Sequence, residues 1–191
     1  MIDVMSNEAI ERVNLILSGV PKGAEKALSS IITRARSTVR STALSQITSV
    51  YDIKAKDVRD RQNTTINMRT RRAEGGIVGE VSFSGSKIPL YRFGVSPKKP
   101  KPGTPVKARQ MKSKPLTMFN DAFIAEMKSG HIGIFERAGR KRFPVEEIMG
   151  ASTAQMVGNS VVLEKVEAAA MDTITKRAEH EITRILNGYG G

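Results

Sequence analysis

The sequence predicts an α+β protein in which two long helices pack on a central antiparallel β-sheet, from which an extended basic loop projects. Three observations predict it. Apolar residues recur at helical spacing near both ends of the chain, over residues 21–50 and 157–186. Between these segments, short runs alternate apolar and polar residues and are separated by glycine-containing turns, which is typical of antiparallel strands. Within this central region, residues 96–114 hold four prolines, seven basic residues and no acidic residue, which favours an extended loop.

The chain has the length of a single domain. It holds 191 residues, of which 39% are hydrophobic and 26% charged, a composition that folds around a core. We therefore expect one domain over residues 1–191. The N-terminal helices are expected in residues 1–61, the central β region with its basic loop in residues 62–142, and an irregular segment with the C-terminal helix in residues 143–191.

Composition excludes several classes of protein. The sequence contains no cysteine, so thiol catalysis, disulfide bonds, cysteine-ligated zinc and iron–sulfur clusters are excluded. The longest apolar runs, such as residues 15–17, are far shorter than the roughly 18 residues that cross a bilayer, so we expect no membrane partner. The chain does not open with a basic stretch followed by an apolar core, so we expect no signal peptide.

The net charge of +12 is concentrated in the middle of the chain. Residues 54–72 carry +5, residues 96–114 carry +7 and residues 128–142 carry +4, whereas residues 1–53 carry +1 and residues 143–191 carry −3. We therefore expect the basic surface to come from loops and strand edges of the central region.

The helices are predicted from apolar periodicity and end signals. Ser6 begins a short helix that Gly19 ends, and Gly188 ends the last helix. The long N-terminal helix is rich in Ser and Thr, so packing must hold it. Its apolar stripe consists of Leu28, Ile31, Ile32, Ala35, Val39, Ala43, Ile47 and Val50. The stripe of the C-terminal helix consists of Val161, Val162, Val166, Ala169, Ala170, Ile174, Ala178, Ile182, Ile185 and Leu186.

Between the long helices the sequence predicts one short helix and a series of strands. The short helix is expected at residues 52–61. Strands are expected at residues 64–71, 77–83, 88–93, 119–127 and 132–137. Residues 146–156 match no regular pattern.

The side chains that catalysis needs are few. His131 and His180 each lack a second histidine at ligand spacing, which favours ordinary surface residues over metal ligands. Residues 84–87 match the short Ser-x-x-Lys pattern of penicillin-binding enzymes, but none of the accompanying motifs is present. Acidic pairs such as Glu146 and Glu147 have no neighbour that would separate their pKa values, so they are expected to be exposed. The sequence therefore predicts no catalytic, metal or cofactor site.

The basic loop is the first candidate for binding. Three roles fit it equally: neutralising phosphates of DNA, contacting an acidic protein neighbour in an assembly, or remaining a solvated loop that keeps the protein soluble. No aromatic residue is interleaved among its basic residues, so base stacking is not indicated. The candidate residues are Lys98, Lys99, Lys101, Lys107, Arg109, Lys112 and Lys114.

The segment from residue 130 to residue 144 is the second candidate. Apolar side chains stand beside arginines there, which is the composition of interface centres. The alternative is a core strand followed by a solvated turn. The candidate interface residues are Ile134, Phe135, Arg137, Arg140, Lys141, Arg142, Phe143 and Pro144.

The order of several motifs resembles a known family. Residues 130–135 form a Gly-His-x-Gly-x-Phe hairpin, residues 139–147 follow the pattern Gly-(Lys/Arg)-x-Arg-x-Pro-(Ile/Val)-x-Glu, and residues 150–152 form Gly-x-Ser with Gln-Met shortly after. Near the start, residues 17–27 look like a short helix, a Gly-x-Pro break and the beginning of a long helix. This order resembles the minor tail protein Z family of long-tailed bacteriophages, and the Lys-rich loop is a departure from it.

The resemblance implies a structural virion protein without catalysis or a cofactor. It implies a tail-completion component at the head-proximal end of the tail, related in fold to the head–tail joining proteins that form rings. The implied partners are further copies of the chain in a hexameric ring and the tail terminator, tail tube or neck proteins. The implied location is the tail and neck region of a virion assembled in the host cytoplasm.

Two other functions remain open from the residues alone. A non-specific nucleic-acid-binding module would use the basic central region and would bind duplex DNA as a monomer. A hydrolase of unknown type is disfavoured because no pair of nucleophile and base is evident.

Overall fold

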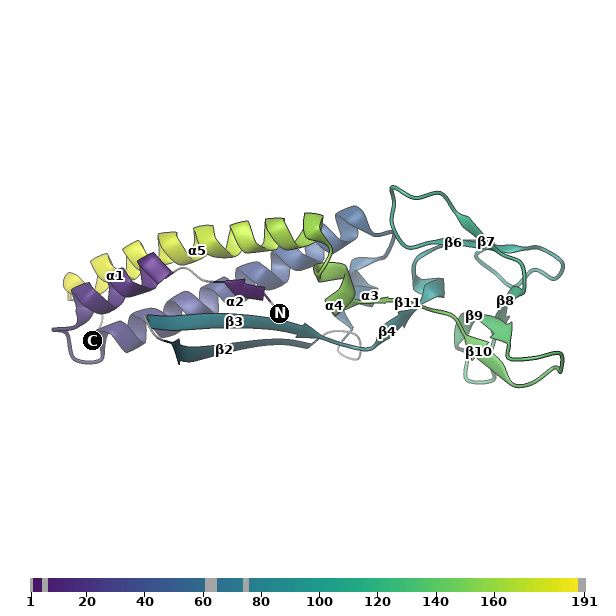
Figure 1. Ribbon diagram of the computed structural model, residues 1–191, viewed down its shortest axis with the longest axis horizontal. Helices are drawn as coiled ribbons and strands as arrows, with labels where there is room; N and C mark the ends of the chain where they lie inside the picture. Colours follow the sequence, from purple (N-terminus) through teal and green to yellow (C-terminus); the bar gives the residue numbers. More distant parts are fainter. Residues whose placement is uncertain (1, 5–6, 61–64, 74–75, 189–191) are drawn as a thin grey trace. The chain divides into compact units, whose positions relative to one another are not determined.

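The computed structural model (Figure 1) describes residues 2–4, 7–60, 65–73 and 76–188. The chain divides into two compact units. The first unit comprises Met1–Ala43, Ile66–Phe83 and Ser160–Gly191, and the second comprises Leu44–Thr65 and Ser84–Asn159. The single-domain organisation stays a prediction, because this division does not test whether either unit folds alone.

The first unit is built mainly from long helices. Its helices are α1 (Asn7–Leu17), the larger part of α2 (Gly23–Val50) and α5 (Ser160–Leu186), and α5 contacts both α1 and β1. Its sheet has the order β1-β3-β2, formed by β1 (Ile2–Val4), β3 (Gly76–Ser84) and β2 (Thr65–Ala73). β1 pairs with β3 in antiparallel register, with Ile2 opposite Val81. The two long helices that the sequence predicts are confirmed.

The core of the first unit follows the predicted helical stripes. Buried positions recur every three or four residues, which places them on one face of each helix. The buried residues of α2 in this unit are Ala27, Leu28, Ile31, Ala35, Val39 and Ala43, and those of α5 include Val162, Val166, Ala170, Ile174, Ala178 and Ile185. Five residues of the predicted stripes differ in this unit. Ile32, Ala169 and Ile182 are only partly buried, while Val161 and Leu186 are 50% and 56% exposed at the ends of α5.

The second unit is built from short strands and turns. One sheet has the order β5-β6-β7 and another the order β10-β9-β8, and β11 pairs with β4 alone. All of these pairs are antiparallel. The strands are β4 (Lys87–Pro89), β5 (Gly94–Ser96), β6 (Val106–Arg109), β7 (Thr117–Phe119), β8 (Ala122–Glu126), β9 (Ile132–Arg137), β10 (Val145–Glu147) and β11 (Met149–Ser152). Two short helices, α3 (Ala55–Arg59) and α4 (Thr153–Val157), and the 3-10 turn η1 (Leu90–Arg92) complete the unit.

The prediction of one central sheet is wrong. The strands are distributed over several small sheets, and those of the second unit have between three and six residues. Proline is one cause, because it lacks an N–H group and cannot continue a ladder. The predicted strand at residues 88–93 ends as a strand at Pro89 and continues as η1, and prolines separate β5 from β6.

The expectation that residues 146–156 are irregular is also wrong. They contain most of β10, all of β11 and most of α4. α4 begins with a capping box in which the Ser152 hydroxyl accepts from the Gln155 backbone and the Gln155 amide oxygen accepts from the Ser152 backbone. The C-terminal helix consequently begins at Ser160 rather than at Val157.

The basic loop is more ordered than an extended loop. Residues 106–109 form β6, the middle strand of its sheet, in which Val106 and Ala108 are buried. Beyond β6, the Asp52 backbone donates to the Gln110 carbonyl at 2.8 Å and the Lys112 backbone donates to the Val50 carbonyl at 2.9 Å. The loop is therefore tied at its C-terminal half to the end of α2.

Candidate functional site

The seven candidate residues of the basic loop have different surroundings. Six lysines are exposed, at positions 98, 99, 101, 107, 112 and 114. Arg109 is partly buried, and its Nε lies 2.7 Å from Oδ2 of Asp52. The Lys112 ammonium donates to the Thr48 carbonyl at 2.6 Å. Arg109 and Lys112 thus fix the loop to its own unit, whereas the other five residues present their charge to solvent.

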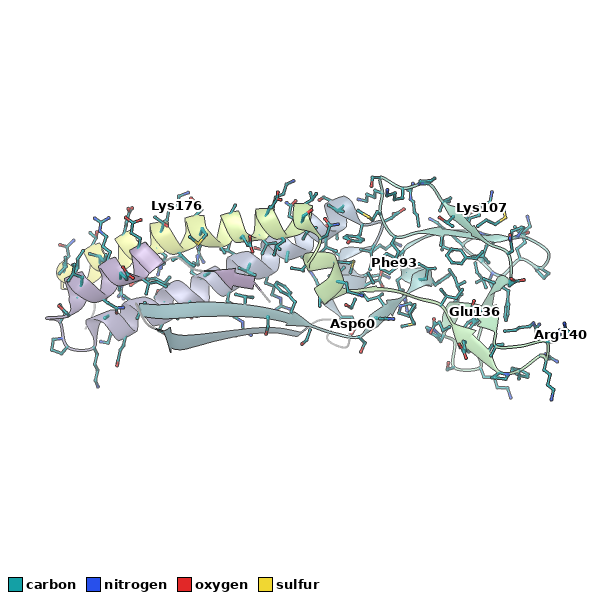
Figure 2. The ribbon with its side chains drawn as sticks, in the orientation of Figure 1. Asp60, Phe93, Lys107, Glu136, Arg140 and Lys176 are labelled. Atoms are coloured by element: carbon teal, nitrogen blue, oxygen red, sulfur yellow. The ribbon has the colours of Figure 1, made fainter. Side chains whose placement is uncertain are left out.

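The sheet β5-β6-β7 has one buried and one exposed face. Successive side chains of a strand point to opposite faces, so Val106 and Ala108 point inward while Lys107 points outward. Ser96 lies opposite Lys107 on β5, and Met118 lies opposite it on β7. Figure 2 labels Lys107 on this sheet. Its outer face therefore combines a lysine with Met118, whose side chain is 49% exposed.

The eight candidate interface residues fall into two groups. Ile134 and Phe135 are buried in the second unit, at 0% and 5% exposure, so they support the hairpin from within. The Phe135 ring packs 6.3 Å from the Phe123 ring. The other six are exposed and lie at the end of β9 and in the turn that leads to β10: Arg137, Arg140, Lys141, Arg142, Phe143 and Pro144. We call these six residues the basic tip.

Contacts within the basic tip hold it in a defined conformation. The Arg137 guanidinium donates to the Arg142 carbonyl at 2.9 Å and lies 5.4 Å from the centre of the Phe123 ring. The Arg142 guanidinium lies 5.6 Å from the Phe143 ring, which is 66% exposed. Arg140 stands at the outer end of the turn (Figure 2). An exposed aromatic ring among four cations is suited to an apolar and acidic partner surface.

His131 has a partner that sequence reasoning missed. Its Nε2 lies 2.7 Å from Oε1 of Glu147, and its ring stands edge-on to Phe135. Glu147 is half-buried, so the expectation that this carboxylate is exposed and unpartnered is wrong. The sequence separates the two residues by a strand and a turn, and their meeting depends on the register of β9 and β10, in which Glu147 faces Phe135.

The comparison with known families decides what kind of protein this is. A family model described as prophage minor tail protein Z (GPZ) matches residues 6–189. The chain belongs to this family. A search of curated proteins and a search of solved structures gave no match. Membership in a family of phage minor tail proteins confirms the resemblance seen in the sequence and agrees with a structural role in the virion tail, in contact with other tail components.

A buried carboxylate in the first unit also escaped sequence reasoning. Glu181 on α5 is fully buried; its Oε1 accepts from the Ser30 hydroxyl at 2.7 Å and lies 2.7 Å from Arg177, while its Oε2 accepts from Arg184 at 2.8 Å. Burial by itself raises the pKa of Glu181, but the bonds from Ser30 and Arg184 and the charges of Arg177 and Arg184 outweigh it and hold that pKa below its ordinary value. Both carboxylate oxygens of Glu181 are thus engaged in contacts within the first unit.

Over residues 2–4, 7–60, 65–73 and 76–188, the structure brings together no group of three or more His, Asp or Glu side chains that could hold a metal ion. None of the helices described has the combination of length and apolar character that crossing a membrane requires.

Proposed function

We propose that this chain is a tail-completion component that acts at the head-proximal end of a bacteriophage tail, where it helps to join the tail to the head and performs no catalysis. The match of residues 6–189 to the minor tail protein Z family is the observation that carries the proposal. The protein would be located in the tail and neck region of a virion assembled in the host cytoplasm.

In this proposal the chain forms a ring, hexameric to match the tail tube. A ring requires heterologous contacts, in which one surface of a subunit meets a different surface of the next. The basic tip supports this role because Phe143 is exposed and is flanked by cations that an acidic neighbour would neutralise. The further partners would be the tail terminator, tail tube or neck proteins.

The test is to reverse two charges of the basic tip. Arg140→Glu and Arg142→Glu together should leave the subunit folded, because both side chains are exposed, and should block its incorporation into tails. The matched control is Arg34→Glu with Arg40→Glu, which reverses two exposed charges on α2. Complementation of a phage lacking the protein measures the outcome. Normal yields of infectious particles with the tip variant would show that the basic tip is not part of the interface.

A second candidate function, non-specific binding of nucleic acid, is favoured by the exposed lysines of the basic loop. Changing Lys98, Lys99, Lys101 and Lys107 to Gln removes four exposed charges. If each contacts a phosphate, the slope of log affinity for duplex DNA against log salt should fall by up to about 3.6, at roughly 0.9 per phosphate. An unchanged slope removes DNA as the partner of the loop. If the variant also docks onto tails as well as the wild type does, the loop does not bind an acidic protein partner either, and its role is that of a solvated loop.

A further inference from the structure

The second unit contains a cleft that lies outside the basic tip and has no role in the proposed function. Its volume is about 630 Å³, and it lies between the segment that leads into α3, the turn η1, and the strands β5 and β6. A cavity of this size falls within the roughly 300–1,000 Å³ of pockets that hold small ligands. We call it the α3 cleft.

The walls of the α3 cleft carry an excess of positive charge. Six basic side chains and two carboxylates line it, a net charge of +4. Both carboxylates already face a cation: Asp52 lies 2.7 Å from Arg109, and Asp57 lies 3.7 Å from Arg92. The Lys112 ammonium is bound to the Thr48 carbonyl.

Three lysines of the cleft remain available to a ligand. Lys54, Lys56 and Lys98 are exposed, and none of them has a side-chain hydrogen bond or ion pair within the part of the chain that the structure describes. The backbone of Lys98 is fixed because the Tyr91 hydroxyl donates to its carbonyl at 2.7 Å. The free charges thus come from two segments, because Lys54 and Lys56 lie at the start of α3 and Lys98 follows β5.

Apolar groups form the rest of the lining. Ile53 and Phe93 are among its lining residues and are nearly fully buried, and Figure 2 labels Phe93. Leu116 lies at the cleft with its side chain 42% exposed. A side chain at Gly94 would collide with the Asp52 carboxylate, so glycine there keeps the Asp52–Arg109 pair in the wall. The cleft therefore offers an apolar contact beside three unpaired cations.

We propose that the α3 cleft binds a short acidic segment of a neighbouring virion protein, with an apolar side chain of that segment against Leu116. Carboxylates of the segment pair with Lys54, Lys56 and Lys98, whose charge is not used within the unit. The assignment of the partner to the virion rests on the proposed function, whereas the binding chemistry rests on the cleft alone.

Duplex DNA fits the α3 cleft less well than an acidic peptide does. Duplex DNA presents mainly phosphates and sugars to a positively charged surface. An apolar side chain such as that of Leu116 adds nothing to phosphate binding but adds to the burial of an apolar peptide side chain.

The test is a binding titration of the full chain with a fluorescent peptide in which one Leu is flanked on each side by two Glu residues. Changing Lys54, Lys56 and Lys98 to Gln should weaken binding by about tenfold, within the roughly 3–100-fold range expected for three exposed ion pairs. The matched control changes Lys87, Lys128 and Lys165 to Gln, which are also exposed but lie outside the cleft, the basic tip and the basic loop, and it should change affinity less than twofold.

The apolar contact has its own pair of variants. Leu116→Ala should lower the affinity for the peptide several-fold. Met118→Ala, which changes a similarly exposed side chain outside the cleft, should leave the affinity unchanged. Equal losses in the two lysine variants would show general attraction to a basic protein and would overturn the proposal. Displacement of the peptide by a short DNA duplex, added at the same concentration of negative charges, would overturn the proposal as well. The absence of saturable binding would also overturn it.

These outcomes are separable from failure of the proposed function. If the peptide binds in the cleft but the protein does not assemble into tails, the tail-completion role fails and the cleft stands. If the tip variant blocks assembly while the peptide shows no saturable binding, the cleft fails and the proposed function stands.

Discussion

The Glu181 ion pair gives the sharpest prediction about stability. Glu181→Gln keeps the size of the side chain and an acceptor oxygen for Ser30 but removes the negative charge that both arginines face. Breaking a buried pair by removing one partner costs roughly 3–5 kcal/mol. Arg177 and Arg184 are 33% and 35% exposed, so water stabilises them once the carboxylate is gone. We therefore expect a smaller loss of about 2–3 kcal/mol.

Chemical denaturation at neutral pH measures this loss, and Glu179→Gln is the control because Glu179 is exposed on the same helix. The control should shift the free energy of unfolding by less than about 0.5 kcal/mol. In a melting experiment, the Glu181→Gln loss corresponds to a fall in Tm of roughly 4–12 °C. If the two variants have the same free energy of unfolding, the buried carboxylate contributes nothing and the reasoning fails.

The pH dependence follows from the direction of the pKa shift. Folding holds the pKa of Glu181 below its ordinary value, so the carboxylate stabilises the native state fully above the unfolded pKa of about 4.3. That contribution is lost as the pH falls below this value and through the lower pKa of the folded state. The difference in stability between wild type and Glu181→Gln should therefore be constant near neutral pH and shrink in acid. A constant difference down to pH 2 would contradict the assignment.

Three further predictions concern packing. Ile31→Ala removes a side chain that is 1% exposed and should cost about 2–5 kcal/mol in denaturant unfolding, whereas Ile32→Ala should cost at least about 1 kcal/mol less because Ile32 is only partly buried. Gly94→Ala should destabilise the second unit by about 0.5–1 kcal/mol, because the new methyl group displaces Asp52 from Arg109 and this ion pair is partly exposed; an unchanged free energy of unfolding would show that the pair can move. Arg137→Gln should cost roughly 0.5–1 kcal/mol by removing the cation over Phe123.

The helices could be predicted from the sequence because their signals are local. Ile31, Ala35 and Val39 belong to a stripe of apolar residues on α2 that recur every three or four residues. Most residues of this stripe and of the corresponding stripe on α5 are buried, as expected. Exposure at Val161 and Leu186 could not be foreseen, because periodicity places a residue on a face but does not show where the partner of that face ends.

The sheets and the polar pairs could not be predicted because their signals are not local. Alternation identifies a strand but not its partner, so nothing in the segment 132–137 shows that β9 lies between β8 and β10. The Asp52–Arg109 and Ser30–Glu181 contacts join residues 57 and 151 positions apart. The exposed cations of the basic tip and the basic loop could be predicted, because a run of charged residues is recognisable from the local sequence alone. The burial of Ile134 and Phe135 beside them could not, because it depends on how the strands pack.

The distribution of charge gives a final prediction about how the two units make contact with partners. The ranges of the second unit hold 18 basic and 8 acidic residues, whereas those of the first hold 13 and 11, so the second unit carries +10 of the net +12. In the first unit, α1 instead exposes Leu15 at 78%.

Screening reduces attraction between exposed charges beyond roughly 8 Å at physiological salt and leaves apolar burial almost unchanged. Docking onto tails through the second unit should therefore weaken steeply between about 50 and 200 mM salt, as contacts made by many exposed cations do. Docking through α1 should keep its affinity across the same range and should weaken with Leu15→Ser instead. The salt dependence of docking, measured for wild type and Leu15→Ser, thus shows which unit carries the contact. Because the tip and the cleft both belong to the second unit, affinity that is independent of salt would contradict both roles.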